Sequence, residues 1–211
     1  MKKIITSQNK ASSCFFRTSI KQPNRKALIQ ITERCNLHCT HCFVSAGDYG
    51  SFMSLENIEK IVIPRLKSCR VVNITLTGGE PFVHKDIINI LQLLKEADLN
   101  VGICTNATCI KQHHLEALEK LGGIHLNVSL DGFSEKSHGV FRGNKKSFIK
   151  TIKMIKVLAK KQLLQGLLVT PNNLAESEEY TRLCDFAVEN KASYVLMNPL
   201  SPMGRGVKSI Q

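Results

Sequence analysis

Short apolar runs rich in β-branched residues alternate with amphipathic segments along most of the chain. The runs predict short buried strands at residues 27–32, 71–76, 100–104, 124–130, 166–170 and 193–197. The segments between them predict helices from about residue 54, where Ser54 is a plausible N-cap, and at 87–95, 115–121, 147–164 and 177–190. Such alternation is typical of an α/β protein with a parallel sheet and right-handed crossovers. Periodicity alone does not distinguish an open, doubly wound sheet from a partial barrel.

The predicted elements follow one another without a linker or a low-complexity tract. We therefore expect one domain over residues 27–211, preceded by an N-terminal leader at residues 1–26. The 211 residues are 43% hydrophobic, which is enough for one substantial core. No stretch approaches the roughly 20 apolar residues of a membrane span, and the first residues lack a secretory apolar segment. These features predict a cytoplasmic protein with no membrane partner.

The formal net charge is +12, so an acidic partner such as nucleic acid has to be considered. Much of the excess lies at residues 146–160, where lysines interleave with apolar residues at helical spacing. That pattern is first of all typical of a solvated helix face opposite a core face. The chain has no arginine-rich run and no basic motif interleaved with aromatic residues, so nucleic acid is not the favoured partner.

The most specific motif follows the first predicted strand, where Cys35, Cys39 and Cys42 form a Cys-x3-Cys-x2-Cys loop. Three thiolates this close in sequence can hold one metal centre. His38 or His41 could complete a tetrahedral zinc site, so structural zinc is the main alternative. Zinc motifs usually add a second, distant pair of ligands, and no such pair follows here. A four-iron cluster held by only three cysteines would keep one iron open to a ligand.

The remaining cysteines share no ligand spacing. In a chain without an export signal, we expect thiols in place of a disulfide framework. Buried thiol is the default expectation for each of them. They are Cys14, Cys69, Cys104, Cys109 and Cys184.

Glycines and small polar residues follow several predicted strands, at the positions where α/β barrels collect their functional groups. Gly78 and Gly79 would let the backbone approach a ligand closely, and Glu80 could offset a ligand ammonium. A tight turn is the alternative for this motif. Polar groups that could bond ribose hydroxyls or a carboxylate, or else form turns and helix caps, follow the third and fourth strands. They are Asn106, Ser129 and Asp131.

Together these motifs resemble the radical S-adenosylmethionine (radical SAM) superfamily. Its signature is a Cys-x3-Cys-x-aromatic-Cys loop after the first strand of a partial barrel of six βα units. His41 stands in the aromatic position, where the family's side chain packs on the adenine. The resemblance covers residues 27–205, and it implies an α/β fold of the partial (β/α)6 TIM-like barrel type with parallel strands.

The resemblance also implies two cofactors, a [4Fe-4S] cluster and S-adenosyl-L-methionine. It makes Cys35, Cys39 and Cys42 the ligands of the cluster. Gly78-Gly79-Glu80 resembles the motif that binds the methionyl amino group. Arg142 fits an arginine that meets the cofactor carboxylate, for which a guanidinium is suited through two parallel bonds. The other implied cofactor contacts are His41, Asn106, Ser129 and Asp131.

The implied activity is reductive cleavage of S-adenosylmethionine to a 5′-deoxyadenosyl radical, which takes a hydrogen atom from a substrate. The implied partners are a low-potential electron donor, flavodoxin or ferredoxin, and a peptide or small-molecule substrate. Residues 202–206 resemble the Pro-x-Gly-Arg stretch of SPASM-type relatives, which modify peptides or mature protein-derived cofactors. Those relatives continue into a domain with auxiliary clusters, and we do not expect that domain here. An RNA-modifying radical enzyme and a non-catalytic metal-binding module are the alternatives.

The cysteine loop predicts that protein prepared without oxygen binds one oxygen-sensitive four-iron cluster. Replacing Cys35, Cys39 or Cys42 with alanine should abolish the visible absorption of the cluster, because each thiolate holds a different iron. Absorption spectroscopy and iron analysis test this expectation. Stoichiometric zinc without iron after anaerobic reconstitution would overturn the assignment.

Overall fold

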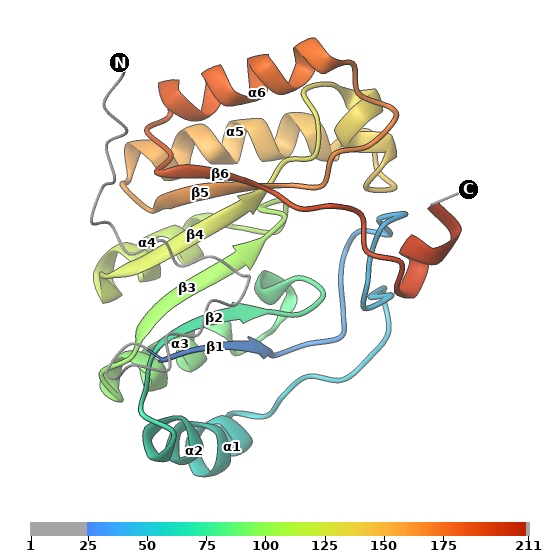
Figure 1. Cartoon of the computed structure of the whole chain (residues 1–211). Coiled ribbons are helices and arrows are strands. Elements are labelled where there is room, and N and C mark those ends of the chain that lie inside the picture. The colour runs from blue at the N-terminus through green and yellow to red at the C-terminus, as the bar shows by residue number, and fades with distance from the viewer. Residues whose placement is uncertain (1–24, 210–211) are drawn as a thin grey trace.

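The computed structural model describes residues 25–209, whose strands form one parallel sheet with helices between them (Figure 1). The strands lie side by side in chain order, and each neighbouring pair is parallel. They are β1 (Arg25–Gln30), β2 (Val71–Thr77), β3 (Asn100–Thr105), β4 (Ile124–Ser129), β5 (Leu164–Val169) and β6 (Tyr194–Met197). Every predicted strand is confirmed, with small shifts at the ends.

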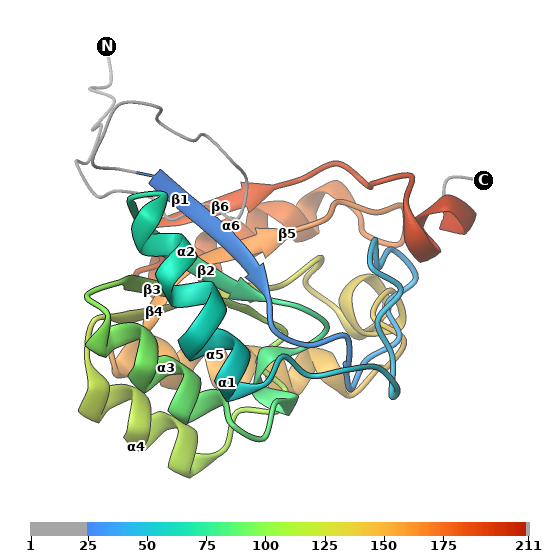
Figure 2. The same ribbon diagram turned by 90° about the horizontal axis from the view of Figure 1, so that it is seen from below.

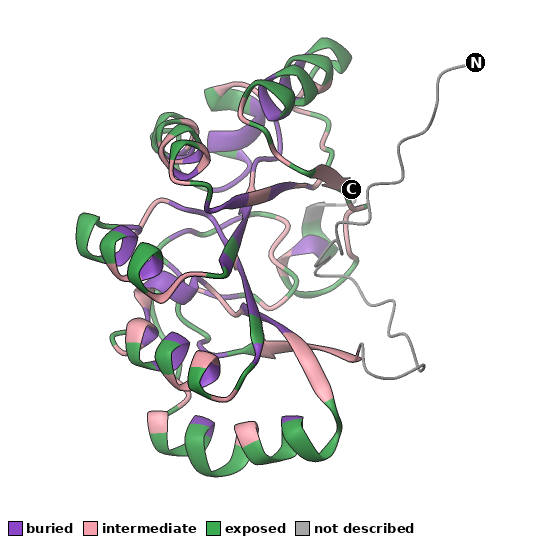
Figure 3. Ribbon diagram, turned by 90° about the vertical axis from the view of Figure 1, so that its left-hand side faces the viewer, coloured by how far each residue is buried: buried purple, intermediate pink, exposed green. Residues whose placement is uncertain are grey.

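This strand order decides between the two predicted architectures. A doubly wound sheet reverses its strand order and carries helices on both faces. Here the order never reverses, and the helices form an arc along one side of the curved sheet (Figures 2 and 3). β1 and β6 stand at the two edges of the sheet. The fold is therefore a partial α/β barrel, as the family resemblance implied.

The helices connect the strands at the predicted places. They are α1 (Leu55–Asn57) and α2 (Ile63–Ser68) with a π-helical turn between them (Ile58–Val62), α3 (Ile87–Glu96), α4 (Gln112–Leu121), α5 (Ser147–Lys160) and α6 (Ser177–Glu189). Ser54 caps α1 as predicted, because its Oγ accepts a hydrogen bond from the Asn57 amide at 3.1 Å. None of the helices in the described part of the chain has the length and apolar character needed to cross a membrane.

Three predicted boundaries differ from the structure. The helix predicted at 115–121 already begins at Gln112, because the His114 ring accepts a hydrogen bond from the Lys111 amide and caps the first turn. The helix predicted at 147–164 ends at Lys160, and Gln162 takes a left-handed conformation (φ 57°) that turns the chain into β5. β1 includes the last two residues assigned to the leader. Residues 1–24, with Cys14, lie outside the described residues, so the rest of the leader stays a prediction.

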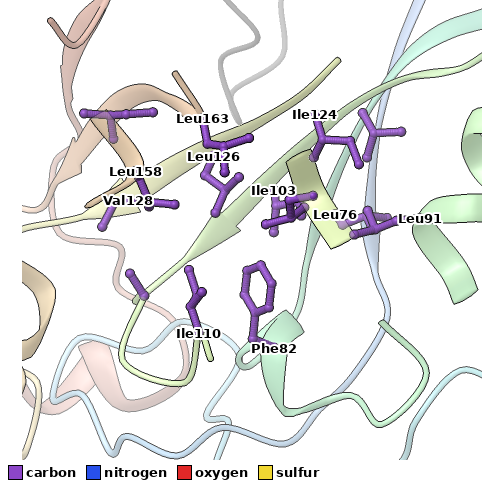
Figure 4. Close-up of a cluster of buried hydrophobic side chains, with 14 of the residues drawn as sticks. Leu76, Phe82, Leu91, Ile103, Ile110, Ile124, Leu126, Val128, Leu158 and Leu163 are labelled. Carbon is purple, nitrogen blue, oxygen red and sulfur yellow. The ribbon is translucent and has the colours of Figure 1, made fainter. Parts of the chain in front are cut away.

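The core lies between the sheet and the arc of helices (Figure 4). Ile103 of β3, Leu126 and Val128 of β4, and Leu158 of α5 are all fully buried. The exposed side of α5 carries the lysines, including Lys150, Lys153 and Lys156, which confirms a solvated face opposite a core face. Binding of a polyanion to that face stays a prediction.

The buried position of Leu126 predicts a clear loss of stability for Leu126→Ala. The cavity left in a close-packed core should lower the free energy of unfolding by about 2–5 kcal/mol. Lys153→Ala on the exposed side of α5 is the control and should change it by no more than about 0.5 kcal/mol. Urea denaturation followed by circular dichroism measures both. Equal effects of the two substitutions would contradict this description of the core.

Candidate functional site

A cavity of about 340 Å³ opens at the carboxyl ends of the strands, between them and the cysteine loop. Side chains from β2, β3, β4 and β5 and from the segment after β6 line it together with the loop. All but one of the predicted site residues lie in its wall. They are Cys35, Cys39, His41, Cys42, Gly78, Gly79, Asn106, Ser129, Asp131 and Arg142. The exception is Glu80.

The cysteine loop folds back along residues 47–53, which run beside its beginning. The Cys35 amide donates to the Gly47 carbonyl at 2.7 Å, and Thr32 pairs with Phe52 in an antiparallel bridge. On the other side, the Thr40 amide donates to the Phe141 carbonyl at 3.0 Å. The loop is therefore held by the backbone of other segments and contains little regular structure of its own.

The thiols of this loop are poorly solvated. Cys35 and Cys39 are each 8% exposed. Burial raises the pKa of Cys35 to about 12, and it raises the pKa of Cys39 despite the opposing charges of Arg142 and Arg205. Thiolates are stable in such a place when a metal or a positive charge compensates them. The loop is thus suited to a bound metal cluster and poorly suited to free thiolates.

The three thiols of the loop form a donor set that fits a cluster. Within residues 25–209, no three histidine, cysteine, aspartate or glutamate side chains are grouped closely enough to hold one metal ion. The thiols of Cys35, Cys39 and Cys42 nevertheless line one cavity. A four-iron cluster is larger than an ion and takes thiolates from more widely separated points. His38, one of the two candidate zinc ligands, lies beside the exposed Asp48 at 3.7 Å.

Gly78 and Gly79 pack directly against the cysteine loop. The Gly79 amide donates to the Thr32 carbonyl at 2.8 Å. Gly78 has φ +151°, and a Cβ atom on it would lie 2.3 Å from the Thr32 oxygen. A Cβ atom on Gly79 would lie 2.1 Å from the carbonyl oxygen of Arg34. The glycines are therefore required for contact between β2 and the loop, whether or not a ligand is bound.

The Glu80 side chain lies outside the cavity wall and is fully buried. Its carboxylate accepts hydrogen bonds from the Thr105 hydroxyl at 2.7 Å, the Asn106 amide at 2.7 Å and the Phe82 amide at 3.1 Å. Burial raises its pKa, while these hydrogen bonds oppose the shift. The predicted contact between this carboxylate and a ligand ammonium stays a prediction. Glu80 ties the end of β2 to the end of β3.

Asp131 and Arg142 form a buried ion pair in the cavity wall. Arg142 Nε donates to Asp131 Oδ2 at 2.6 Å, and the Thr170 amide donates to Asp131 Oδ1 at 2.9 Å. Burial alone would raise the pKa of Asp131, but the Arg142 charge outweighs it and holds this pKa below its ordinary value. Asp131 is thus an anion whose main task is to orient the guanidinium of Arg142.

His41 lies beside this pair and stacks on Phe141, with ring centroids 4.1 Å apart and planes 10° apart. Its Nε2 is 3.6 Å from Asp131 Oδ2. Burial lowers the pKa of His41 to about 4, so the ring is neutral at pH 7. A neutral flat ring in the cavity wall suits stacking against another flat group. Contact with an adenine stays a prediction.

The Asn106 side chain bridges the cysteine loop and the turn after β3. Its Nδ2 donates to Asn36 Oδ1 at 3.0 Å and lies 3.9 Å from the Cys35 sulfur. Its Oδ1 accepts hydrogen bonds from the amide and the hydroxyl of Thr108. Because both ends of the carboxamide are engaged, Asn106 orients the loop at Cys35. Ser129 lines the same cavity from β4.

Two site residues were missed because their role depends on distant contacts. His138 is fully buried, and its Nδ1 accepts a hydrogen bond from the Asp131 amide at 3.1 Å. In the sequence, Arg205 is marked only by the Pro-x-Gly-Arg stretch, whereas in the structure its guanidinium binds carbonyls of the cysteine loop. An isolated histidine has no pattern that could signal such a contact. The Pro-x-Gly-Arg stretch did mark Arg205 as unusual, but a sequence motif does not show which distant segment the side chain contacts.

The expectation of buried thiols elsewhere is wrong for Cys69 and Cys184, which are both exposed. Cys69 terminates α2, and Cys184 follows the buried Leu183 on α6, so the helical repeat turns it toward solvent. Cys109 is half-buried. Cys104 lines the cavity from β3 and is disulfide-bonded, so the expectation of a thiol is wrong at this position too.

The buried ion pair predicts that Asp131→Asn will destabilise the fold. It leaves the Arg142 charge buried without its partner, which should lower the free energy of unfolding by about 3–5 kcal/mol. Glu119→Gln is the matched control, because it breaks an ion pair with Lys161 at the surface and should cost no more than about 1 kcal/mol. Denaturant titrations of both variants compare the two. A loss at position 131 no larger than that at 119 would mean that the pair is not desolvated.

Comparison with known proteins gives the family. The sequence profile of the Radical SAM superfamily matches residues 29–184. The antilisterial bacteriocin subtilosin biosynthesis protein AlbA of Bacillus subtilis is 35% identical over 135 residues, 63% of this chain and 30% of AlbA. An AdoMet-dependent heme synthase of Methanosarcina barkeri is 32% identical over 183 residues, 85% of this chain and 52% of the synthase.

Solved structures show the same fold. Streptococcus suis SuiB bound to its precursor peptide SuiA has a TM-score of 0.72 and 25% identity, over 84% of this chain and 39% of SuiB. SuiB has also been solved with S-adenosylmethionine. This chain therefore spans about half or less of the length of these relatives. The profile match, the parallel partial barrel and the cysteine loop agree: the chain belongs to the radical SAM superfamily.

Proposed function

We propose that this chain is the core of an enzyme that binds a [4Fe-4S] cluster and S-adenosylmethionine and makes a substrate radical. The observation that carries the proposal is the convergence of three thiols, a neutral aromatic ring and a buried Asp131–Arg142 pair on one cavity. In this family, the cluster supplies an electron that cleaves S-adenosylmethionine reductively, and a low-potential donor such as a flavodoxin or ferredoxin reduces the cluster. The chain's own residues then have to bind and orient S-adenosylmethionine and shield the reaction from water.

Arg142 is suited to binding the carboxylate of the cofactor. Asp131 accepts a hydrogen bond from Nε, which leaves the terminal guanidinium nitrogens to donate to a ligand. Asp131 also neutralises the charge of Arg142, so that the two side chains together carry no net charge. The carboxylate of the cofactor would then meet guanidinium N–H groups that Asp131 holds in a fixed direction. The His41 ring, backed by Phe141, offers a flat surface for the adenine.

We propose a peptide as the substrate class. The named functions of AlbA and SuiB support this choice, since one serves bacteriocin biosynthesis and the other is solved with a precursor peptide. The Pro-x-Gly-Arg stretch at residues 202–205 agrees with it. The relationship to a heme synthase makes a small molecule the competing substrate class. Hydrogen transfer from a labelled substrate into the nucleoside product separates the two classes.

The proposal predicts formation of 5′-deoxyadenosine when the reconstituted protein is reduced in the presence of S-adenosylmethionine. Cys39→Ala should abolish it, because the cluster loses a ligand. Cys184→Ala is the matched control and should keep it, since Cys184 is exposed on α6. Anaerobic reconstitution, reduction with dithionite and chromatography of the products provide the measurement. Iron-loaded protein that forms no nucleoside above the Cys39→Ala level would refute the proposed activity.

A further inference from the structure

The segment after β6 returns to the cysteine loop and crosses it. It ends in a short 3-10 helix (Gly204–Ser209), which lies next to the loop in Figure 1. Arg205 Nε donates to the Cys39 carbonyl and Nη1 to the Ala46 carbonyl, each at 2.8 Å. The Arg205 amide donates to the Cys42 carbonyl at 2.9 Å. One residue thus binds the backbone of two cluster cysteines.

The glycine before Arg205 makes this close contact sterically possible. Gly204 has φ +56°, and a Cβ atom on it would lie 2.5 Å from the carbonyl oxygens of both Cys42 and Phe43. A Cβ on Gly206 would lie 2.2 Å from the Ser201 carbonyl oxygen. A side chain at position 204 would push the segment away from the loop, and one at position 206 would distort the segment itself. The contact therefore depends on the backbone as well as on the guanidinium.

The loop has few hydrogen bonds of its own to replace this contact. Within it, the Cys42 amide reaches the Cys39 carbonyl only at 3.3 Å, and the Ser45 amide reaches the Cys42 carbonyl at 3.2 Å. The Cys39 and Cys42 carbonyls thus accept their shortest hydrogen bonds from Arg205. Without Arg205, the Cys39 and Cys42 carbonyls would lose the hydrogen bonds that tie them to the segment after β6.

Arg205 also brings positive charge to the thiols. Together with Arg142, it opposes the effect of burial on the pKa of Cys39. Its Nη2 is buried and has no hydrogen-bond partner among residues 25–209. An unsatisfied buried donor is unfavourable, so a binding partner at this place stabilises the structure. An anionic group bound beside Cys39 would provide one.

We propose that Arg205 is a positioning residue for the cluster: it holds the cysteine loop in its metal-binding shape before iron arrives and stabilises the added negative charge of the reduced cluster. The inference rests on the proposed cluster at Cys35, Cys39 and Cys42. The shape of the empty loop, however, can be measured without any metal, so the two claims can fail separately.

The variants Arg205→Gln and Arg205→Lys separate shape from charge. Glutamine removes the charge and the fork of donors. Lysine keeps the charge but cannot bind two carbonyls with a planar fork. Lys208→Gln is the matched control, because it removes one exposed charge from the same 3-10 helix without touching the loop. Circular dichroism confirms that each variant is folded.

The first measurement is the rate of iodoacetamide labelling of Cys39 in the metal-free protein, followed by mass spectrometry. We expect several-fold faster labelling in both Arg205 variants, because the loop opens, and a wild-type rate in Lys208→Gln. The exposed Cys184 serves as the internal reference and should react equally in all of them. Wild-type labelling of Cys39 in both folded Arg205 variants would overturn the role in shape. Should Arg205→Gln not fold, Arg205→Lys alone decides this point.

The second measurement is the midpoint potential of the reconstituted cluster, followed by electron paramagnetic resonance. Loss of the positive charge in Arg205→Gln should shift the potential to a more negative value, while Arg205→Lys and Lys208→Gln should stay near wild type. An unchanged potential in Arg205→Gln would overturn the electrostatic role. Failure of the wild-type protein to take up iron would refute the proposed function instead, and the labelling result would still decide whether Arg205 shapes the loop.

Discussion

The cysteine loop is held in shape by hydrogen bonds from backbone and side chains that lie far away in the sequence. The Gly79 amide binds the start of the loop from β2, the Phe141 carbonyl receives the Thr40 amide, and Arg205 binds the carbonyls of Cys39 and Cys42. A parallel sheet in unbroken strand order brings all these groups to one edge. The barrel thus provides the hydrogen-bond partners that hold one irregular loop in place.

Two buried carboxylates in this region serve different purposes because their partners differ. Glu80 is satisfied by a hydroxyl and two amides of the protein, so it joins strand ends and has no charge partner in direct contact. Asp131 is paired with Arg142, so it fixes the direction of a donor that faces the cavity. Buried carboxylates with full hydrogen bonding stiffen a structure. Only the second arrangement also offers a charged group to a ligand.

Much of the fold and part of the site could be predicted from the sequence. The alternation of strands and helices gave the element order, since hydrophobic periodicity reports which side of each element is buried. The cysteine spacing located the loop, and the polar residues after each strand located the cavity. The direction of a side chain at a strand end is set by its tertiary neighbours, and no periodicity reports it. For that reason the sequence does not predict the hydrogen bonds of Glu80 to the end of β3, nor the contacts of His138 and Arg205.

The long separation between the loop and Arg205 has a consequence for biosynthesis. Arg205 follows Cys39 by 166 residues. At a translation rate of about 5–20 residues per second, roughly 8–33 s pass between the synthesis of the two residues. During that interval the three cysteines have already been synthesised, but Arg205, which binds the backbone of their loop, has not. On the proposed role of Arg205, the loop reaches its metal-binding shape only after the sixth strand and Arg205 have been made, so cluster insertion would follow the synthesis of nearly the whole described chain.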